Sequence, residues 1–191
     1  MIPILLHRIT VTALTAVLVA AEPCTLTISH AMQGSPYTLR YAYSLRYKGD
    51  TENPLTNGNI EDPGCTATTL PAVWNGFHGV DLDMALKIRK NKKFSKVEVR
   101  FLDLPGSRIF APEQVYLYTG QGKHRERMKL ESEVTREERV AGGSVVIHHF
   151  KLRSEGMKHL SLQAVNKGVC PPDHPDAGQT AWLFCDEVIF R

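Results

Sequence analysis

Three pairs of adjacent acidic residues are the first candidates for chemistry in this chain: Glu61-Asp62, Glu137-Glu138 and Asp186-Glu187. Two neighbouring carboxyl groups can share acid and base or nucleophile roles, as they do in glycoside hydrolysis. The first two pairs stand in no recognisable catalytic context. The third follows an apolar run, which places it near the end of a final strand.

The adjacent histidines His148 and His149 are the next candidates. On a strand, successive side chains point to opposite faces, so the two rings cannot easily chelate one metal ion. We predict one surface ring and one half-buried ring with its hydrogen bonds satisfied. The sequence also lacks a GxSxG elbow, a phosphate-binding glycine loop and an HExxH motif, so no familiar catalytic motif is present.

The cysteines at positions 24, 65, 170 and 185 show no CxxC spacing, which argues against a zinc site. Two disulfides in any of three pairings remain open if the protein is secreted. Cys185 interrupts the apolar segment 182–188 and is expected to be buried as a small hydrophobic residue.

The composition describes a globular protein without a marked charge preference. Hydrophobic residues make up 42% and charged residues 23%, which excludes a disordered chain. The net charge of +3 arises from interspersed acids and bases, so nucleic acid is not expected as a partner. The basic run at residues 87–93 is read as a solvated turn.

Residues 1–29 admit two interpretations. His7 and Arg8 followed by an apolar stretch to residue 21 resemble a signal peptide, which predicts a secreted or periplasmic protein. The stretch is too short to span a membrane. Alternatively, the alternation at residues 9–15 and the segment 22–28 are typical of two strands.

Short apolar runs separated by turn signals fill the rest of the chain. We expect strands at residues 80–88, 96–102, 114–118, 143–152, 159–166 and 181–185. The charged segment 123–139 is either a short helix or, as we favour, a strand with flanking loops. Spaced strands without crossover helices predict an all-β sandwich or jelly roll. The loop rich in Pro, Gly and Asp that leads into the last strand is suited to present a binding or contact surface.

Several motifs, in order, resemble a known module. They are LTNG at residues 55–58, WNGFHGVDL at 74–82, VEVRFL at 97–102, PGSRIFAP at 105–112, and AWLFCDEV at 181–188. Residues 37–191 thereby resemble the discoidin-like (F5/8 type C) module that ends many bacterial family 20 glycoside hydrolases, the β-N-acetylhexosaminidases. The resemblance implies a galactose-binding-like, discoidin-type jelly roll over residues 30–191. It also implies that residues 1–29, if they are not a signal segment, are a remnant of the preceding immunoglobulin-like domain.

The implied function is a non-catalytic, carbohydrate-binding accessory module for an N-acetylhexosamine-type or galactose-type glycan. The catalytic Asp-Glu pair of this hydrolase family requires a barrel of about 250 residues, which the chain cannot hold, so Asp186-Glu187 is not expected to be that pair. Two alternatives stay open. The module can be a structural domain that packs against a hydrolase barrel, or the chain can be a fragment of a hexosaminidase that carries the family's hydrolase label.

The resemblance also suggests one cofactor, a structural calcium ion. Related carbohydrate-binding modules hold Ca²⁺ between an Asp-Gly-Asn loop and a glutamate of the last strand, and Asn57, Asn59 and Glu187 match those positions. Asn57 replaces the usual Asp and removes one charged ligand, which weakens a calcium site. The alternative is a turn closed by asparagine side chains.

Sugar binding needs an aromatic ring for stacking and polar groups that read hydroxyls. The candidate residues are Trp74, Asn75, His78, Arg108, Phe110 and His174. Trp74 has an equal alternative as a core residue beneath the loops, and Trp182 is assigned to the core. Arg108 stands where the resembling modules often carry Trp, so a stacking platform is missing there.

Overall fold

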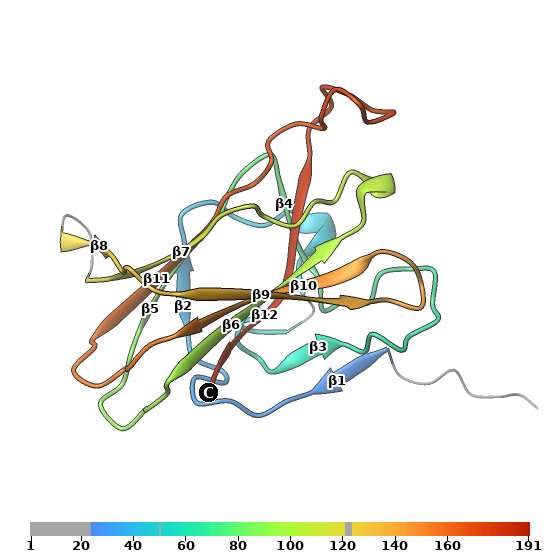
Figure 1. Ribbon diagram of the computed structural model, residues 1–191. Coiled ribbons are helices and arrows are strands. Elements are labelled where there is room, and N and C mark those ends of the chain that lie inside the picture. The colour runs from blue at the N-terminus through green and yellow to red at the C-terminus, as the bar shows by residue number, and fades with distance from the viewer. Residues whose placement is uncertain (1–23, 50, 121–123) are drawn as a thin grey trace, which may run out of the picture.

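The computed structural model describes residues 24–49, 51–120 and 124–191, and they form two antiparallel sheets packed face to face with a short two-stranded ribbon beside them (Figure 1). The prediction of an all-β sandwich is confirmed. Within these residues the helical elements are two 3₁₀ turns, η1 (Leu45–Tyr47) and η2 (Pro105–Ser107).

The first sheet has five strands. In spatial order they are β4 (Asn75–His78), β12 (Trp182–Phe190), β6 (Lys96–Asp103), β10 (Ser144–Lys151) and β9 (Ser132–Glu138). The order places the C-terminal strand next to the centre of the sheet, so the end of the sequence completes the core.

The second sheet also has five strands. They are β2 (Tyr37–Leu39), β5 (Leu82–Lys87), β11 (His159–Ala164), β7 (Val115–Thr119) and β8 (Glu126–Arg127). The separate ribbon pairs β1 (Thr25–Thr27) with β3 (Asn59–Glu61).

Alternation along the strands builds the core between the sheets. Val97, Val99 and Phe101 are fully buried, while the residues between them face the outer side of the first sheet. A smaller cluster that includes Trp74 and Phe184 covers part of that outer side. Strand β12 is therefore packed on both faces, which explains its nearly continuous apolar sequence.

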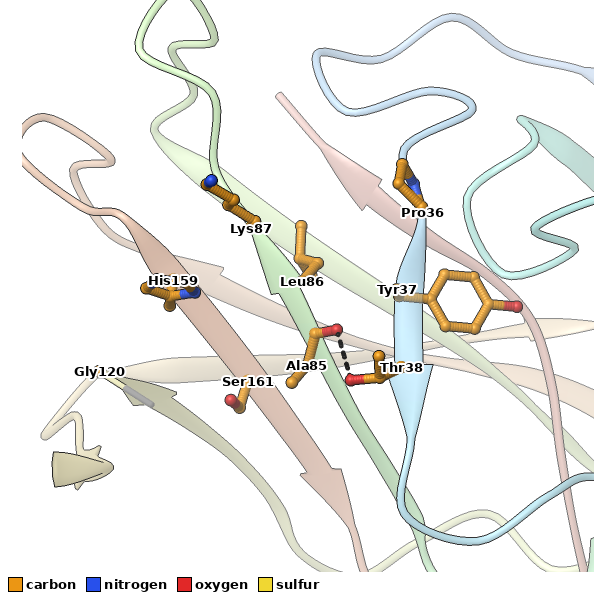
Figure 2. Close-up of a pocket in the computed structure, with 9 residues that line it drawn as sticks. All are labelled: Pro36, Tyr37, Thr38, Ala85, Leu86, Lys87, Gly120, His159 and Ser161. Carbon is orange, nitrogen blue, oxygen red and sulfur yellow. Dashed lines mark hydrogen bonds between the residues drawn. The ribbon is translucent and has the colours of Figure 1, made fainter. Parts of the chain in front are cut away.

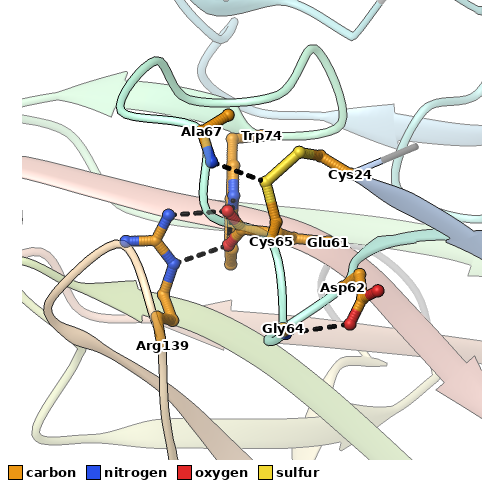
Figure 3. Close-up of a disulfide and its surroundings, with 8 residues drawn as sticks. All are labelled: Cys24, Glu61, Asp62, Gly64, Cys65, Ala67, Trp74 and Arg139. Atoms are coloured by element: carbon orange, nitrogen blue, oxygen red, sulfur yellow. Dashed lines mark hydrogen bonds and ion pairs between the residues drawn. A yellow bond between two sulfur atoms is a disulfide. The ribbon is translucent and has the colours of Figure 1, made fainter. Parts of the chain in front are cut away.

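A disulfide joins Cys24 to Cys65 and ties β1 to the loop after β3 (Figure 3). Cys170 and Cys185 are free and buried, so the prediction of a buried Cys185 is confirmed. The strand expected within residues 22–28 is present as β1. The signal peptide and the strand at residues 9–15 lie outside the described residues. In the described part of the chain no helix is long and apolar enough to cross a membrane.

Candidate functional site

One end of the sandwich gathers the loops that the sequence singled out. The loop before β12 projects there, next to β4, η1 and the turn that contains η2 (Figure 1). We call this end the loop rim. Its aromatic and basic side chains are Tyr47, His78, Arg108, Phe110, Lys167, His174 and Trp182. The predicted residues His78, Arg108, Phe110 and His174 are thus brought together.

The centre of the rim is a cluster of rings around Trp182. His78 stacks on the indole with 4.2 Å between ring centroids, and Tyr47 meets it edge-on at 5.3 Å. Trp182 is half-buried and His78 is exposed, so the expected assignment of Trp182 to the core holds only in part. The rings are fixed by packing, which leaves little entropy to lose on binding.

The η2 turn is attached to Trp182 by its backbone. Trp182 N–H donates to the Arg108 carbonyl at 2.8 Å, and Phe110 N–H donates to the Trp182 carbonyl at 3.0 Å. Arg108 adopts a left-handed conformation with φ of 60°. This sharp reversal turns the 105–110 loop back onto β12. The Arg108 guanidinium lies 3.9 Å from Asp176, and both side chains are partly exposed, so this pair is weak.

His174 fastens the loop before β12 to the η2 turn. Its Nδ1 accepts a hydrogen bond from Asp176 N–H at 2.9 Å, so the ring proton is on Nε2. Nε2 then donates to the Pro105 carbonyl at 2.8 Å. The ring also meets Phe110 edge-on, with centroids 5.7 Å apart. His174 therefore shapes the rim and has both nitrogens engaged.

A cavity of about 160 Å³ opens beside the ring cluster. Trp182, Tyr47 and Leu104 supply apolar walls, and Ser107 and Arg139 supply polar groups. Arg139 is 7% exposed. Its guanidinium donates to both carboxylate oxygens of Glu61 at 2.6 and 2.7 Å, so the positive charge at the cavity is neutralised (Figure 3).

Trp74 and Asn75 do not belong to this surface. Trp74 is 2% exposed and its indole N–H donates to Glu61 at 3.1 Å, while Asn75 is 0% exposed. The Asn75 side chain accepts from Gly49 N–H and donates to backbone carbonyls. Their burial corrects the prediction that these two residues contact sugar, and it selects the core alternative for Trp74.

The predicted calcium ligands are engaged with protein donors. Glu187 accepts from Gly58 N–H at 2.9 Å and contacts His30 Nε2 at 3.1 Å. The side-chain oxygen of Asn57 accepts a hydrogen bond from Asn59 N–H, and the side-chain oxygen of Asn59 accepts one from the Thr27 hydroxyl. Hydrogen-bond donors occupy these oxygens, so a calcium ion at this position would have to displace them. No group of three or more His, Cys, Asp or Glu residues suited to a metal occurs among the described residues.

The acid pair at the end of the chain sits at an irregularity of β12. The pairing with β6 shifts register between Cys185 and Val188, and both Asp186 and Glu187 are 0% exposed. Burial raises the pKa of Asp186 against the opposing charge of Arg100, whose Nε lies 3.2 Å from both carboxylate oxygens. In the described structure the pair lies in the interior and holds strands together.

The two adjacent histidines face opposite sides of β10, as expected. His148 is buried, however, and not on the surface: it is 6% exposed, and burial lowers its pKa. The Phe101 ring meets it edge-on, with ring centroids 5.7 Å apart. His149 is half-buried, with both ring nitrogens engaged, which confirms the other half of the prediction.

A second depression lies on the outer face of the second sheet (Figure 2). It measures about 300 Å³, and its lining includes Ala85, Ser161, Lys87 and His159. The Tyr37 ring points away from it, and the Tyr37 hydroxyl accepts from Leu55 N–H in the interior (Figure 2). The depression thus offers the imidazole of His159 but no Trp, Tyr or Phe ring for stacking, whereas the loop rim gathers several aromatic rings.

Sequence reasoning missed Tyr47 and Arg139, which line the rim cavity. Tyr47 stands in a polar loop and Arg139 in a charged run, so neither position carries a distinctive local signal. Comparison with known proteins gives no further assignment, because neither the known protein families nor the curated proteins contain a match to this chain.

Proposed function

We propose that the chain is a carbohydrate-binding module and that the loop rim is its binding surface. The observation that carries the proposal is the cluster of Trp182, His78 and Tyr47 beside a small cavity with Arg139 at its wall. Aromatic rings stack against the apolar faces of sugars, and fixed polar groups then read the hydroxyls. An arginine neutralised by a carboxylate suits a neutral sugar, since it offers donors without a net charge.

The cavity size favours a terminal sugar unit. Its volume of about 160 Å³ is below the ~300–1,000 Å³ of pockets for drug-sized ligands. A surface that buries little area gives weak binding, on the order of 0.1–1 mM, and 1 mM corresponds to about 4 kcal/mol. Such an affinity is enough for a module that tethers a partner activity to a glycan-rich surface.

The family and the compartment are part of the same proposal. The order of motifs supports kinship with the discoidin-like tails of β-N-acetylhexosaminidases, and the two-sheet sandwich is compatible with their jelly roll. The Cys24–Cys65 disulfide supports an oxidising location such as the periplasm or the cell exterior. The glycan is then an N-acetylhexosamine or a galactose-type sugar.

A second candidate function rests on exposed apolar residues in the rim segments. Leu45 in η1 is 89% exposed, and Val169 in the loop before β12 is 53% exposed. Apolar side chains at the edge of a binding surface are typical of contacts between proteins. They favour a structural module that docks on a hydrolase catalytic domain.

A glycan array followed by calorimetry with the purified chain tests the proposal. Binding to a glycan set is expected, and His78→Ala, Arg108→Ala and Trp182→Ala should each weaken it at least tenfold. Tyr116→Ala is the matched control, because this ring lies on the second sheet under Arg127 and its loss should leave binding unchanged. Melting curves identify any variant that fails to fold; His78 is exposed and its variant should melt as wild type does. Absence of binding by the wild type would eliminate the carbohydrate function and favour docking.

A further inference from the structure

A groove separate from the loop rim lies between the β1–β3 ribbon and the outer face of the first sheet. It measures about 410 Å³. Its apolar lining consists of Ile28, Ile60, Ile147 and Ile189, and its polar lining consists of Glu98, Arg100, Thr135, Glu137, His149 and Arg191. A groove that joins an apolar wall to several polar groups has the composition of a small-molecule site.

A hydroxyl, an imidazole and a carboxylate are connected in sequence along this groove. The Thr135 Oγ1 lies 2.7 Å from His149 Nε2, and His149 Nδ1 lies 3.2 Å from a carboxylate oxygen of Glu98. The three residues come from β9, β10 and β6, which are neighbours in one sheet. Paired strands fix their positions, because His149 stands directly opposite Glu98 and Thr135 directly opposite the residue two before His149.

The groups around Glu98 and His149 determine which atoms of these two side chains carry a proton. Burial alone would raise the pKa of Glu98, but hydrogen bonds from Lys96 at 2.6 Å and Arg191 at 2.9 Å outweigh it and lower the pKa to about 2. Glu98 is therefore a carboxylate near neutral pH. A carboxylate can only accept, so His149 carries its proton on Nδ1 and presents the Nε2 lone pair to the Thr135 hydroxyl. This is the arrangement in which an imidazole removes a proton from a nucleophile.

Two cationic side chains line the same groove. Arg100 is 4% exposed and lies 3.6 Å from Glu137, which is two residues along β9 from Thr135. Arg191 is half exposed and approaches from the end of the chain. Both guanidinium groups are paired with carboxylates, Arg100 with Asp186 and Glu137 and Arg191 with Glu98. They therefore offer N–H donors, and no free positive charge, to the oxygen of a reacting carbonyl.

We propose that this groove hydrolyses carboxylic esters with a short aliphatic acyl group, with Thr135 as nucleophile, His149 as general base and acid, and Glu98 as a positioning residue. The Thr135 oxygen adds to the ester carbonyl carbon while its proton moves to His149 Nε2. The carbon–oxygen bond to the alcohol then breaks, and the alcohol leaves with that proton. Water adds to the acyl-threonine while one of its protons moves to His149 Nε2. The bond between the acyl carbon and the Thr135 oxygen then breaks, His149 returns that proton to the Thr135 oxygen, and the carboxylic acid is released.

The apolar wall decides the substrate class. Isoleucine side chains from the ribbon and the sheet give a surface for a hydrocarbon acyl group, whereas the loop rim offers rings for a sugar. The activity is independent of glycan binding, so either proposal can fail without the other.

The test is the hydrolysis of p-nitrophenyl acetate and p-nitrophenyl butyrate by the full chain. Removal of the nucleophile in Thr135→Val and of the base in His149→Gln should each lower kcat/KM by about a hundredfold or more. Thr135→Ser keeps the hydroxyl and should retain turnover. Ser132→Ala removes a hydroxyl from the same strand outside the groove and should leave the rate unchanged. Glu98→Gln should lower kcat with little change in KM, and Glu98→Asp should restore part of it, which a purely structural role does not predict.

A covalent readout keeps the proposal testable if a variant fails to fold. A fluorophosphonate probe is expected to modify wild-type protein, and mass spectrometry should place the adduct on Thr135. Hydrolysis at the same rate by wild type and Thr135→Val would overturn the proposal, because surface histidines alone hydrolyse such esters slowly. An absence of both turnover and Thr135 labelling in the wild type would overturn it as well and identify the three residues as a structural polar ladder.

Discussion

At the scale of single residues, the buried charged side chains of this protein form ion pairs and hydrogen bonds between segments that are distant in sequence. Glu61 is 1% exposed and receives hydrogen bonds from Arg139 and from the Trp74 indole (Figure 3). Glu61 was considered as a catalytic acid, but in the structure its carboxylate joins β3 to the loop that contains Arg139. A buried ion pair contributes little net stability while intact, but either partner left alone is a costly unpaired charge.

The Glu61–Arg139 pair gives a stability prediction. Arg139→Met should lower the free energy of unfolding by about 3–5 kcal/mol, because the Glu61 carboxylate stays buried without its partner. The double variant Glu61→Gln with Arg139→Met should recover much of the loss, since both charges are then removed. Urea denaturation measures both changes. Equal losses in the single and double variants would show that the pair matters through shape and not through charge.

The sequence allowed us to predict which residue types could bind a ligand, but it did not show which of those residues are buried. His78, Arg108, Phe110 and His174 stand in loops, and the structure brings them to one end. Trp74 and Asn75 also stood next to polar loop residues, yet they are buried because the β4 region packs under the η1 turn. Burial at such positions depends on which loop covers which strand, and that is information about distant segments.

At the scale of elements, long apolar runs were predictable and short polar strands were not. Strands β6, β10 and β11 have clear apolar patterns and were expected close to their observed bounds. Strand β12 was expected over residues 181–185, and it continues through the acid pair to Phe190. Strand β3 has the sequence Asn-Ile-Glu and exists because β1 pairs with it. A strand that a single partner stabilises has no periodic signal of its own.

The disulfide is the device that secures the β1–β3 ribbon. It closes a loop with a sequence separation of 41 residues, for which loss of chain entropy in the unfolded state predicts about 4 kcal/mol of stabilisation. The double variant Cys24→Ser with Cys65→Ser should therefore lower the free energy of unfolding by about 2–4 kcal/mol. Denaturation of the variant beside the reduced wild type measures it. A loss below about 1 kcal/mol would mean that the ribbon is held mainly by its hydrogen bonds.

At the scale of the whole molecule, buried titratable groups link stability to pH. Burial raises the pKa of Glu187 from 4.5 to about 9, and burial lowers the pKa of His30 from 6.5 to about 4. Between these limits both side chains are neutral. His30 Nδ1 accepts a hydrogen bond from Phe190 N–H, so Nε2 carries the ring proton and donates to Glu187 across 3.1 Å. This pair joins β12 to the segment that follows β1.

The raised pKa of Glu187 makes alkaline conditions unfavourable. Below pH 4.5 folded and unfolded states both hold this proton; above it the unfolded state releases the proton while the folded state keeps it until about pH 9. From pH 4.5 to 6.5 the opposite effect of His30 offsets the loss. The melting temperature should therefore fall between pH 6.5 and 9, and less steeply in Glu187→Gln. Identical slopes in wild type and variant would contradict the assignment.

The same pair decides how the protein should respond to calcium. A calcium ion takes six to eight oxygen ligands, and at this position it would have to displace Gly58 N–H and the His30 ring from Glu187. We therefore expect millimolar calcium chloride and a chelator to give the same melting temperature for the wild type. Replacement of the ring by a carboxylate in His30→Asp, combined with Asn57→Asp, adds the missing charged ligands and should make the melting temperature rise with calcium. A calcium-dependent rise in the melting temperature of the wild type would instead mean that calcium can displace the His30 ring from Glu187. The neutral hydrogen-bonded pair would then form only in the absence of calcium.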